Sequence, residues 1–482
     1  MKNWCGGSAI VRFAAREGVL SRAWEDSLFC RGVTFLMNIP TKILQWIYQK
    51  GKAAFEDSFF ARLAFGVLED LPFLVGWLML LFLVIPYEKW SNGYSFAGFV
   101  LCMGLSLFAG MRRKNWKLDL AALGPWLIAF FFALLLAFPM SAYPELSARF
   151  LKYYGACILC VIVIVSTVER KEHLMRLAGM SSLALIVMSA YAFYQRASGI
   201  EANPLFIDMN LELNKNIPGR VFSFFENPNA FGEVLLLLIP VAVGLMLGSR
   251  GWGGRILGGF SAAMGCGALI MTYSRASWIG LFFAAALFVL LWNRKLIPAC
   301  ILVVFAAIPL LPDNILNRFL TIFDSSDTST SSRFPLYYAA GEFLTQRPLL
   351  GAGLGSDAVR QAISDLNLFH GYDRFVHCHN IYLQVWCETG LLGLISFVGG
   401  ILWTAKKGAK AVLKAACDPS VRMVILGGIT ALMGTMLCGM ADYIWNYPRV
   451  MLVFWFVCAL ALAGIRLAAW EEAKGGDLRE GV

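Results

Sequence analysis

Three of the four histidines of this chain, His370, His377 and His379, lie within ten positions of one another. The last two belong to a short polar run, 376–380 (VHCHN), that directly precedes a hydrophobic stretch. A neutral imidazole near pH 7 can take a proton from a hydroxyl group, so His379 is a candidate general base. The alternative is a helix-capping or interface histidine. A metal site with Cys378 is not predicted, because no Asp or Glu flanks the pair at ligand spacing.

A second candidate for chemistry is Arg275, in the run 273–277 (YSRAS) between two apolar stretches. A guanidinium held so close to lipid is costly unless it reaches the interface or meets an anion. Its planar fork suits a phosphate, to which it can donate two hydrogen bonds at once. The alternative is an interfacial anchor, or an internal ion pair with Glu226 or Asp442.

Two further arginines accompany Arg275. Arg220 precedes an aromatic run and the segment 226–233 (ENPNAFGE), and Arg333 begins a predicted helix. Within that segment, Asn229 can either bind a sugar hydroxyl or act as a helix N-cap. All three arginines stand at the entrances of predicted helices, where they could meet an anionic ligand.

The elements that position these residues are membrane spans. Of 482 residues, 59% are hydrophobic and only 15% are charged, more apolar surface than a water-soluble protein could bury. Apolar windows of about 17–22 residues recur, each long enough to cross a hydrocarbon core of about 30 Å. We therefore predict an all-α polytopic membrane protein with about twelve spans, at 67–86, 94–111, 120–138, 151–168, 177–195, 231–248, 256–273, 276–292, 296–312, 381–404, 423–441 and 450–467.

Lys and Arg are distributed unevenly between the predicted loops. One alternate set holds more of them than the other set, which is about three times as long. Cytoplasmic loops are enriched in Lys and Arg, so this set and both chain termini are predicted to be cytoplasmic. The net charge of +10 does not indicate that the protein binds nucleic acid, because anionic lipid headgroups attract Lys and Arg residues on the cytoplasmic side. The enriched loops are 112–117, 169–176, 249–255, 293–295 and 405–422.

The chain is predicted to form one membrane domain, 63–468, between a basic cytoplasmic N-terminal tail, 1–62, and a cytoplasmic C-terminal tail, 469–482. Within the first tail, residues 31–50 are predicted either to lie flat on the membrane as an amphipathic segment or to remain solvated.

One large external loop, 313–378, is the predicted wall of a site. It begins with a disorder-prone stretch, 324–332 (DSSDTSTSS), and continues with a helix over about 335–346. A second helix is predicted to run through 359–366 (VRQAISDL). Between them, 351–356 (GAGLGS) lacks the Lys-Ser/Thr of a nucleotide-binding loop, so a flexible turn is predicted there.

At these residues the chain resembles the O-antigen ligase and polymerase family of bacterial membrane glycosyltransferases. The resemblance covers the centre and the C-terminal half, and the HN-aromatic-Leu opening followed by Glu-x-Gly is its most specific part. The segments that carry it are Arg220 with ENPNAFGE (226–233), TYSRASWIG (272–280), SSRFPLYYAAGEFL (331–344), RPLLGAGLGS (347–356) and HNIYLQVWCETGLLG (379–393).

The resemblance implies a fold similar to that of O-antigen ligase and an inverting glycan transfer that needs no metal or other cofactor. The donor would be a glycan on undecaprenyl diphosphate, the acceptor a hydroxyl of a glycan or glycolipid, and the site would face outward from the bacterial inner membrane. Arg220 and Arg275 would bind the donor diphosphate, and His379 would activate or position the acceptor. The predicted catalytic residues are His379 and Arg275, and the predicted substrate-binding residues are Arg220, Arg333, Asn229, Asn380 and His377.

Two alternatives stay open at this point. A polymerase would give the glycan to another lipid-linked repeat unit, and it needs the same residues as a ligase. A polysaccharide or lipid transporter is the alternative outside the enzymes. Transporters usually show internal repeats and polar residues near the middle of the membrane, whereas the polar residues of this chain gather at the external ends of the spans.

Overall fold

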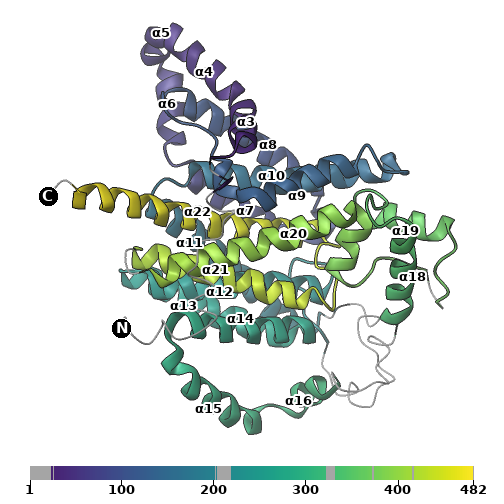
Figure 1. The fold of residues 1–482 in the computed structure, drawn as a ribbon. Coiled ribbons are helices and arrows are strands. Elements are labelled where there is room, and N and C mark those ends of the chain that lie inside the picture. The colour runs from purple at the N-terminus through teal and green to yellow at the C-terminus, as the bar shows by residue number, and fades with distance from the viewer. Residues whose placement is uncertain are drawn as a thin grey trace.

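The computed structural model describes residues 23–24, 26–200, 202, 219–321, 332–371, 374–414 and 417–480. Within these ranges every regular element is a helix, which confirms the all-α prediction. The long helices run side by side (Figure 1). Helices α18 and α19 lie together at one end of the bundle, which we call the loop end, and the last turns of α22 lie at the other, which we call the basic end.

The bundle is made of α7 (Leu71–Val84), α8 (Asn92–Met111), α9 (Gly124–Ala137), α10 (Pro144–Thr167), α11 (Lys171–Ala197), α12 (Pro228–Gly248), α13 (Trp252–Met271), α14 (Arg275–Asn293), α15 (Ile297–Ala307), α20 (Ile381–Leu413), α21 (Pro419–Cys438) and α22 (Pro448–Glu480). The shorter helices are α3 (Leu28–Met37), α4 (Ile39–Lys50), α5 (Lys52–Asp57), α6 (Phe59–Leu68), α16 (Asp313–Leu320), α18 (Arg333–Gln346) and α19 (Ser356–Asp365).

The described residues contain nine helices that are long and apolar enough to cross a membrane, or ten if the bent pair α6 and α7 forms one span. The polytopic membrane architecture is therefore confirmed. Each of the twelve predicted windows falls on a helix, but α9 is short, and α14 and α15 lie in one apolar segment that extends to Leu310. The count of twelve stays a prediction.

Helices α12, α21 and α22 form the centre of the bundle, where more than four-fifths of each apolar window is buried. Glycines let α12 and α21 approach closely. A Cβ atom on Gly244 would lie 2.4 Å from the carbonyl oxygen of Met423, and one on Gly427 would lie 2.4 Å from that of Pro240. Small residues at such crossings are typical of packed membrane helices.

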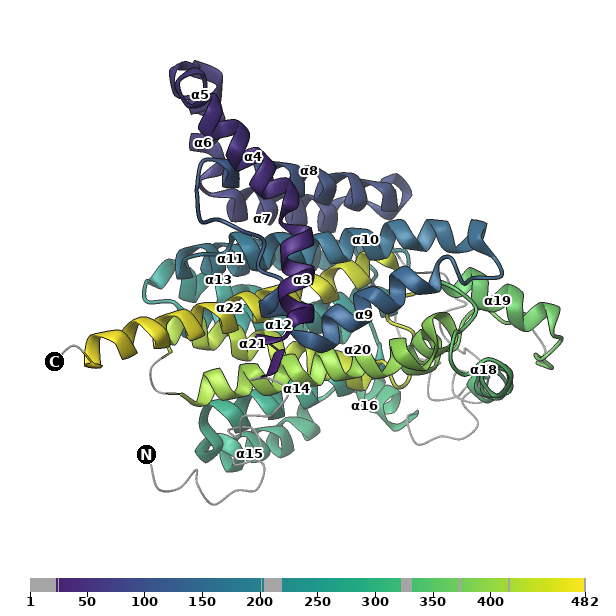
Figure 2. The same cartoon turned by 45° about the horizontal axis from the view of Figure 1, so that its top comes forward.

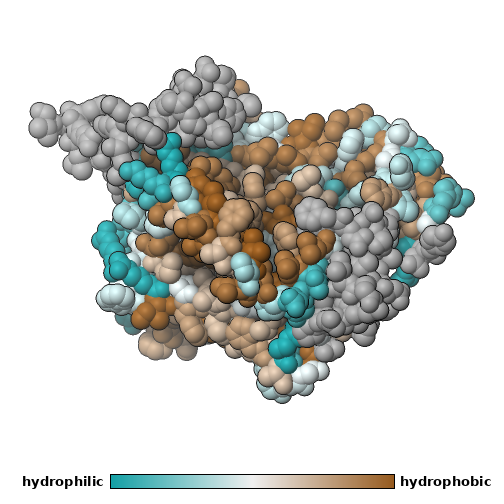
Figure 3. Space-filling view, turned by 90° about the horizontal axis from the view of Figure 1, so that it is seen from below, coloured by the Kyte–Doolittle hydropathy of each residue, from teal (hydrophilic) through white to brown (hydrophobic). Residues whose placement is uncertain are grey.

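The face that carries α15 is apolar across its middle and hydrophilic toward its two ends (Figure 3). No residue of α15 is buried by the rest of the chain, and Leu302, Val303 and Phe305 are each about two-thirds exposed. An apolar belt of this kind is the surface that a hydrocarbon core covers.

Helices α3 to α6, here called the N-terminal arm, cross the direction of the bundle (Figure 2). The arm is fixed by side chains that pair with the loop between α8 and α9. The amide of Asn38 accepts the N–H of Leu118 at 2.7 Å and donates to its carbonyl at 3.1 Å. Gln45 donates to the carbonyl of Arg113 at 2.7 Å. Residues 31–50 are thus helical and docked, with Phe35, Ile43 and Trp46 exposed, which favours the amphipathic alternative.

The two helices predicted in the large loop are confirmed as α18 and α19. The disorder-prone stretch 324–332 lies outside the described residues except for Ser332. The prediction of a flexible turn at 351–356 is wrong, because these residues are buried. They fill a break in α20, where Gly390 has φ 72°, and the N–H groups of Ala352 and Gly353 donate to the carbonyls of Cys387 and Glu388 at 2.7 and 3.1 Å.

Gly353→Ala should therefore destabilise the loop end. Gly353 has φ +113°, and a Cβ there would lie 2.0 Å from Oγ of Ser141, so we expect a loss of about 1–3 kcal/mol and a lower midpoint of thermal unfolding in detergent. Gly341→Ala, on α18 with no atom within 4 Å of the added Cβ, is the matched control and should leave the midpoint unchanged or raise it. Equal midpoints for the two variants would contradict the buried role of 351–356.

Candidate functional site

Four helices, α12, α14, α20 and α22, begin at the loop end, so their positive dipole ends point toward the same region. The segments between them are held in unusual conformations. Ser223, Tyr273 and His379 have φ values of 51°, 52° and 45°, which are uncommon for residues other than glycine. Such outliers persist only where packing enforces them, and they cluster at functional sites.

His379 and Asp442 form a hydrogen-bonded pair that joins two loops. Nδ1 of His379 lies 3.1 Å from Oδ1 of Asp442, and the two side chains are 35% and 14% exposed. Asp442 also accepts the backbone N–H of Tyr443 at 2.8 Å. Because the carboxylate holds Nδ1, Nε2 is the nitrogen that can face a substrate. This is the arrangement in which an imidazole can accept a proton from a hydroxyl group.

The charge of Asp442 is stabilised by its surroundings. Burial raises the pKa of this carboxyl, but its hydrogen bond with His379 and the charge of Arg333 outweigh burial and hold the pKa below its usual range. Asp442 is therefore ionised at neutral pH and would stabilise a positive charge that forms on His379.

His377 lies behind His379 and supports it. Its Nδ1 accepts the backbone N–H of His379 at 3.1 Å, and the two ring centroids are 4.0 Å apart. Burial, followed by the ring of His379, lowers the pKa of His377 to about 3, so this ring is neutral at physiological pH. Its contacts are those of a positioning residue, and its predicted contact with substrate stays a prediction.

A buried carboxylate, Glu388, ties the two sides of the His379–Asp442 pair together. Its side chain accepts hydrogen bonds from Tyr443 at 2.8 Å, from Tyr154 at 2.9 Å and from Gln384 at 3.0 Å. Gln384 in turn accepts the backbone N–H of Cys378 at 2.9 Å. The loop before His379 and the turn after Asp442 are thus connected through one acidic group.

Arg220 is almost completely buried beside the end of α13. It donates to the carbonyl of Thr272 at 2.6 Å and also to the side-chain oxygen of Asn229. Burial and the nearby charges of Arg318 and Arg275 lower the pKa of Arg220 to about 9. Arg220 therefore lies close enough to Arg318 and Arg275 to be repelled by both charges, an arrangement that an anionic ligand would stabilise.

Arg275 begins α14 and reaches α16. It donates to the carbonyl of Thr321 at 2.9 Å and to its hydroxyl at 2.8 Å, contacts that sequence analysis did not foresee. Arg318 of α16 is buried and donates to the carbonyl of Tyr273 at 3.3 Å. Arg220 and Arg318 thus donate to successive carbonyls of the turn between α13 and α14. These bonds fix the position of Arg275, the first residue of α14.

Arg333 enters the same region from α18. Its charge contributes to the lowered pKa of Asp442 and opposes the effect of burial on the pKa of Tyr337. Tyr337, one turn further along α18, donates its hydroxyl to the carbonyl of His379 at 3.3 Å. The large loop therefore reaches the His379–Asp442 pair directly.

The two asparagines predicted to bind substrate, Asn229 and Asn380, both form hydrogen bonds within the protein. Asn227, and not Asn229, is the N-cap of α12, since its side chain accepts the N–H of Asn229 at 2.7 Å. Asn380 caps α20, accepting the N–H groups of Tyr382 and Leu383 at 2.9 and 3.0 Å. These contacts explain both positions structurally, so a role of Asn229 or Asn380 in binding substrate stays a prediction.

The structure brings together all the histidines and arginines that the sequence analysis placed in the site. Sequence analysis missed the pairing of Asp442 with His379, although a carboxylate in the short turn between α21 and α22 was a signal. It also missed Arg318, although this residue lies near the start of the predicted loop 313–378. Among the described residues no group of three or more His, Cys, Asp or Glu side chains could hold a metal ion. The arrangement can bind an anion beside a proton acceptor.

Comparison with known families gives a match, over residues 260–398, to the family model described as O-antigen ligase. No curated protein matches the chain. The matched range contains Arg275, Arg333, His377, His379 and Asn380, and it ends before Asp442. The resemblance found in the sequence is confirmed over this segment, which supplies most of the site and matches the O-antigen ligase family model.

Proposed function

We propose that this protein transfers a glycan from an undecaprenyl-diphosphate donor to an acceptor hydroxyl at the loop end, as an O-antigen ligase. The observation that carries the proposal is the His379–Asp442 pair beside the guanidinium groups of Arg220, Arg275 and Arg318. A proton acceptor next to a cationic pocket suits a reaction in which a hydroxyl displaces a diphosphate.

In the proposed reaction, Nε2 of His379 takes the proton of the acceptor hydroxyl while its oxygen attacks the anomeric carbon of the donor sugar. Asp442 keeps Nδ1 protonated and stabilises the positive ring that results, as the orienting acid does in other His-based catalysts. The bond between the anomeric carbon and the diphosphate oxygen breaks, and its electron pair stays on the diphosphate. A single displacement of this kind inverts the anomeric configuration.

The leaving diphosphate would be stabilised by Arg275 and Arg220. Both guanidinium groups are already oriented by the backbone at Thr272 and Thr321, so little reorganisation would be needed when negative charge develops. The proposal invokes no metal ion, because these cations supply the neutralising charge.

The loop end is proposed to face the outside of the inner membrane, with both chain termini in the cytoplasm. The support is the Lys and Arg distribution, which places the basic loops at the opposite end. Nucleotide sugars are cytoplasmic, so an external site is consistent with a donor linked to lipid.

The experiment that tests the function is mass spectrometry of glycolipids after the purified protein is mixed with undecaprenyl-diphosphate oligosaccharide and an acceptor, without nucleotide. Release of undecaprenyl diphosphate with one glycan added to the acceptor would identify a ligase. A ladder of lengthened lipid-linked chains would identify a polymerase instead. If no acceptor yields product, the transferase proposal fails.

His379→Ala should lower the transfer rate by about 10²–10⁴-fold, because the reaction loses its base. Asp442→Asn should lower it by about 10²-fold or more with donor binding retained, because an amide can stabilise the wrong tautomer of His379. Both would be measured as initial rates of product formation.

His370→Ala is the matched control, since His370 lies in the same loop but is exposed. It should keep the wild-type rate. A fully active His379→Ala enzyme with a normal unfolding midpoint would show that the proposed base is wrong.

Arg275→Ala should reduce the rate by about 10²–10³-fold, the effect of losing one electrostatic contact worth about 3–4 kcal/mol in the transition state. Arg275→Lys should recover only part of the rate, because an ammonium group lacks the planar fork. Arg347→Ala removes an exposed arginine at the end of α18 and should be neutral. Equal rates for Arg275→Ala and Arg347→Ala would exclude a contact between Arg275 and the leaving group.

A further inference from the structure

A cavity of about 460 Å³ lies at the basic end of the bundle, opposite the loop end that holds the His379–Asp442 pair. It is lined by residues of α6 in the N-terminal arm, of α7, of the end of α8 and of the loop between α10 and α11. A second cavity of about 350 Å³ shares Phe65, Glu69 and Arg112 with it. Volumes of this size fall within the range of about 300–1,000 Å³ that is typical of small-molecule sites.

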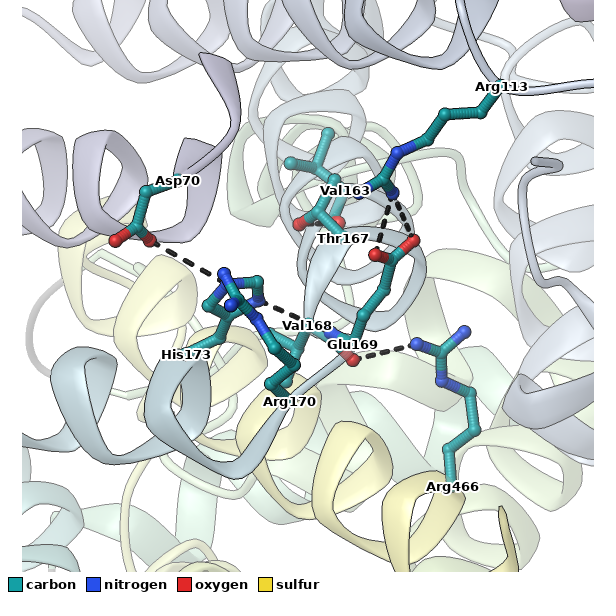
Figure 4. Close-up of polar contacts among 9 residues, drawn as sticks. All are labelled: Asp70, Arg113, Val163, Thr167, Val168, Glu169, Arg170, His173 and Arg466. Carbon is teal, nitrogen blue, oxygen red and sulfur yellow. Dashed lines mark hydrogen bonds and ion pairs between the residues drawn. The ribbon is translucent and has the colours of Figure 1, made fainter. Parts of the chain in front are cut away.

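The polar part of the wall carries an excess of positive charge. Three arginines line the cavity, Arg112, Arg113 and Arg170, against two carboxylates, Glu69 and Glu169. Arg113 donates hydrogen bonds to both carboxylate oxygens of Glu169, at 2.7 and 2.6 Å (Figure 4).

The other two arginines are less compensated. Arg112 and Glu69 are 3.9 Å apart and both side chains are more than half exposed, a geometry that contributes little. Arg170 donates to Nε2 of His173 at 3.3 and 3.0 Å (Figure 4), and in the described part of the chain it forms no ion pair with a carboxylate. An imidazole nitrogen that accepts from a guanidinium carries no proton, so His173 adds no charge. Oδ1 of Asp70 lies 4.0 Å from that nitrogen but is in a carboxylate already paired with Arg176, so the charge of Arg170 is compensated only in part.

The apolar part of the wall comes from the arm. Helix α6 turns Phe65 and Leu68 into the cavity, while Phe59, Phe60, Leu63 and Val67 on its other sides are each more than half exposed. Helix α6 meets α7 at 69° instead of continuing the bundle direction. A helix with one apolar side packed on the protein and another left exposed can place the exposed side against lipid.

We propose that this cavity binds one anionic phospholipid of the cytoplasmic leaflet, with its phosphate between Arg112 and Arg170 and its glycerol and first acyl carbons against Phe65 and Leu68. Arginine forks bind phosphate oxygens in pairs, and basic pockets between membrane helices on the cytoplasmic side recognise such headgroups. The bound lipid would join the arm to the bundle. This inference is independent of the glycan-transfer proposal.

The test is native mass spectrometry of the full chain titrated with phosphatidylglycerol or phosphatidylcholine. The wild-type protein should hold one phosphatidylglycerol at least about tenfold more tightly than phosphatidylcholine. The double variant Arg112→Ala/Arg170→Ala should lose that preference. The matched control is Arg250→Ala/Lys295→Ala, which removes two exposed basic side chains from the same end. This variant should keep the preference for phosphatidylglycerol.

Two further measurements complete the test, a variant that fills the cavity and a soluble competitor for the phosphate. Ala109→Phe fills the cavity without changing its charge and should also abolish the preference, so it tests the site if the double variant has a lowered unfolding midpoint. Glycerol phosphate added as a soluble competitor should not displace the lipid at concentrations near the lipid's own Kd. Displacement there would identify a soluble phosphate site and overturn the lipid assignment, and so would an unchanged preference in both cavity variants.

Discussion

The buried carboxylate of Glu388 is the group on which the arrangement of the loop end depends. A charge or polar acid inside a membrane helix is costly unless hydrogen bonds satisfy it. Its partners come from α10, from α20 itself and from the turn before α22, and the N–H of Gly355 adds one from the large loop. Satisfying one acid therefore requires four segments to meet at one place, and His379 and Asp442 are attached to two of them.

Hydrogen bonds to nearby acceptors also explain how Arg220, Arg275 and Arg318 can lie together at the loop end. Mutual repulsion opposes their approach, and after burial it is the next cause of the lowered pKa of Arg220. The carbonyl groups of Thr272 and Tyr273, at the negative end of the α13 dipole, offset part of that repulsion. The chain thus holds these cationic groups in fixed positions, and charge stabilisation of the proposed transition state would require such preorganisation.

The two ends of the bundle differ in the side chains they carry, and a closely packed centre separates them. Close glycine contacts between α12 and α21 leave little room for one helix to slide on the other. The loop end concentrates titratable groups and strained backbone, whereas the basic end carries the N-terminal arm, with apolar side chains exposed and bases along its rim. A ligand at either end would therefore meet a surface that the centre keeps in place.

Hydropathy and charge are properties of local sequence, so the sequence by itself determined the membrane class, the helical windows and the uneven basic loops, and it singled out His379, Arg220 and Arg275 as candidates. What only the tertiary structure decided are the partners. His379 meets Asp442 across 63 positions, Arg275 meets Thr321, and the residues at 351–356 fill the break in α20 instead of forming a flexible turn. Such contacts depend on how helices pack against one another, and no periodicity within a single segment encodes that packing.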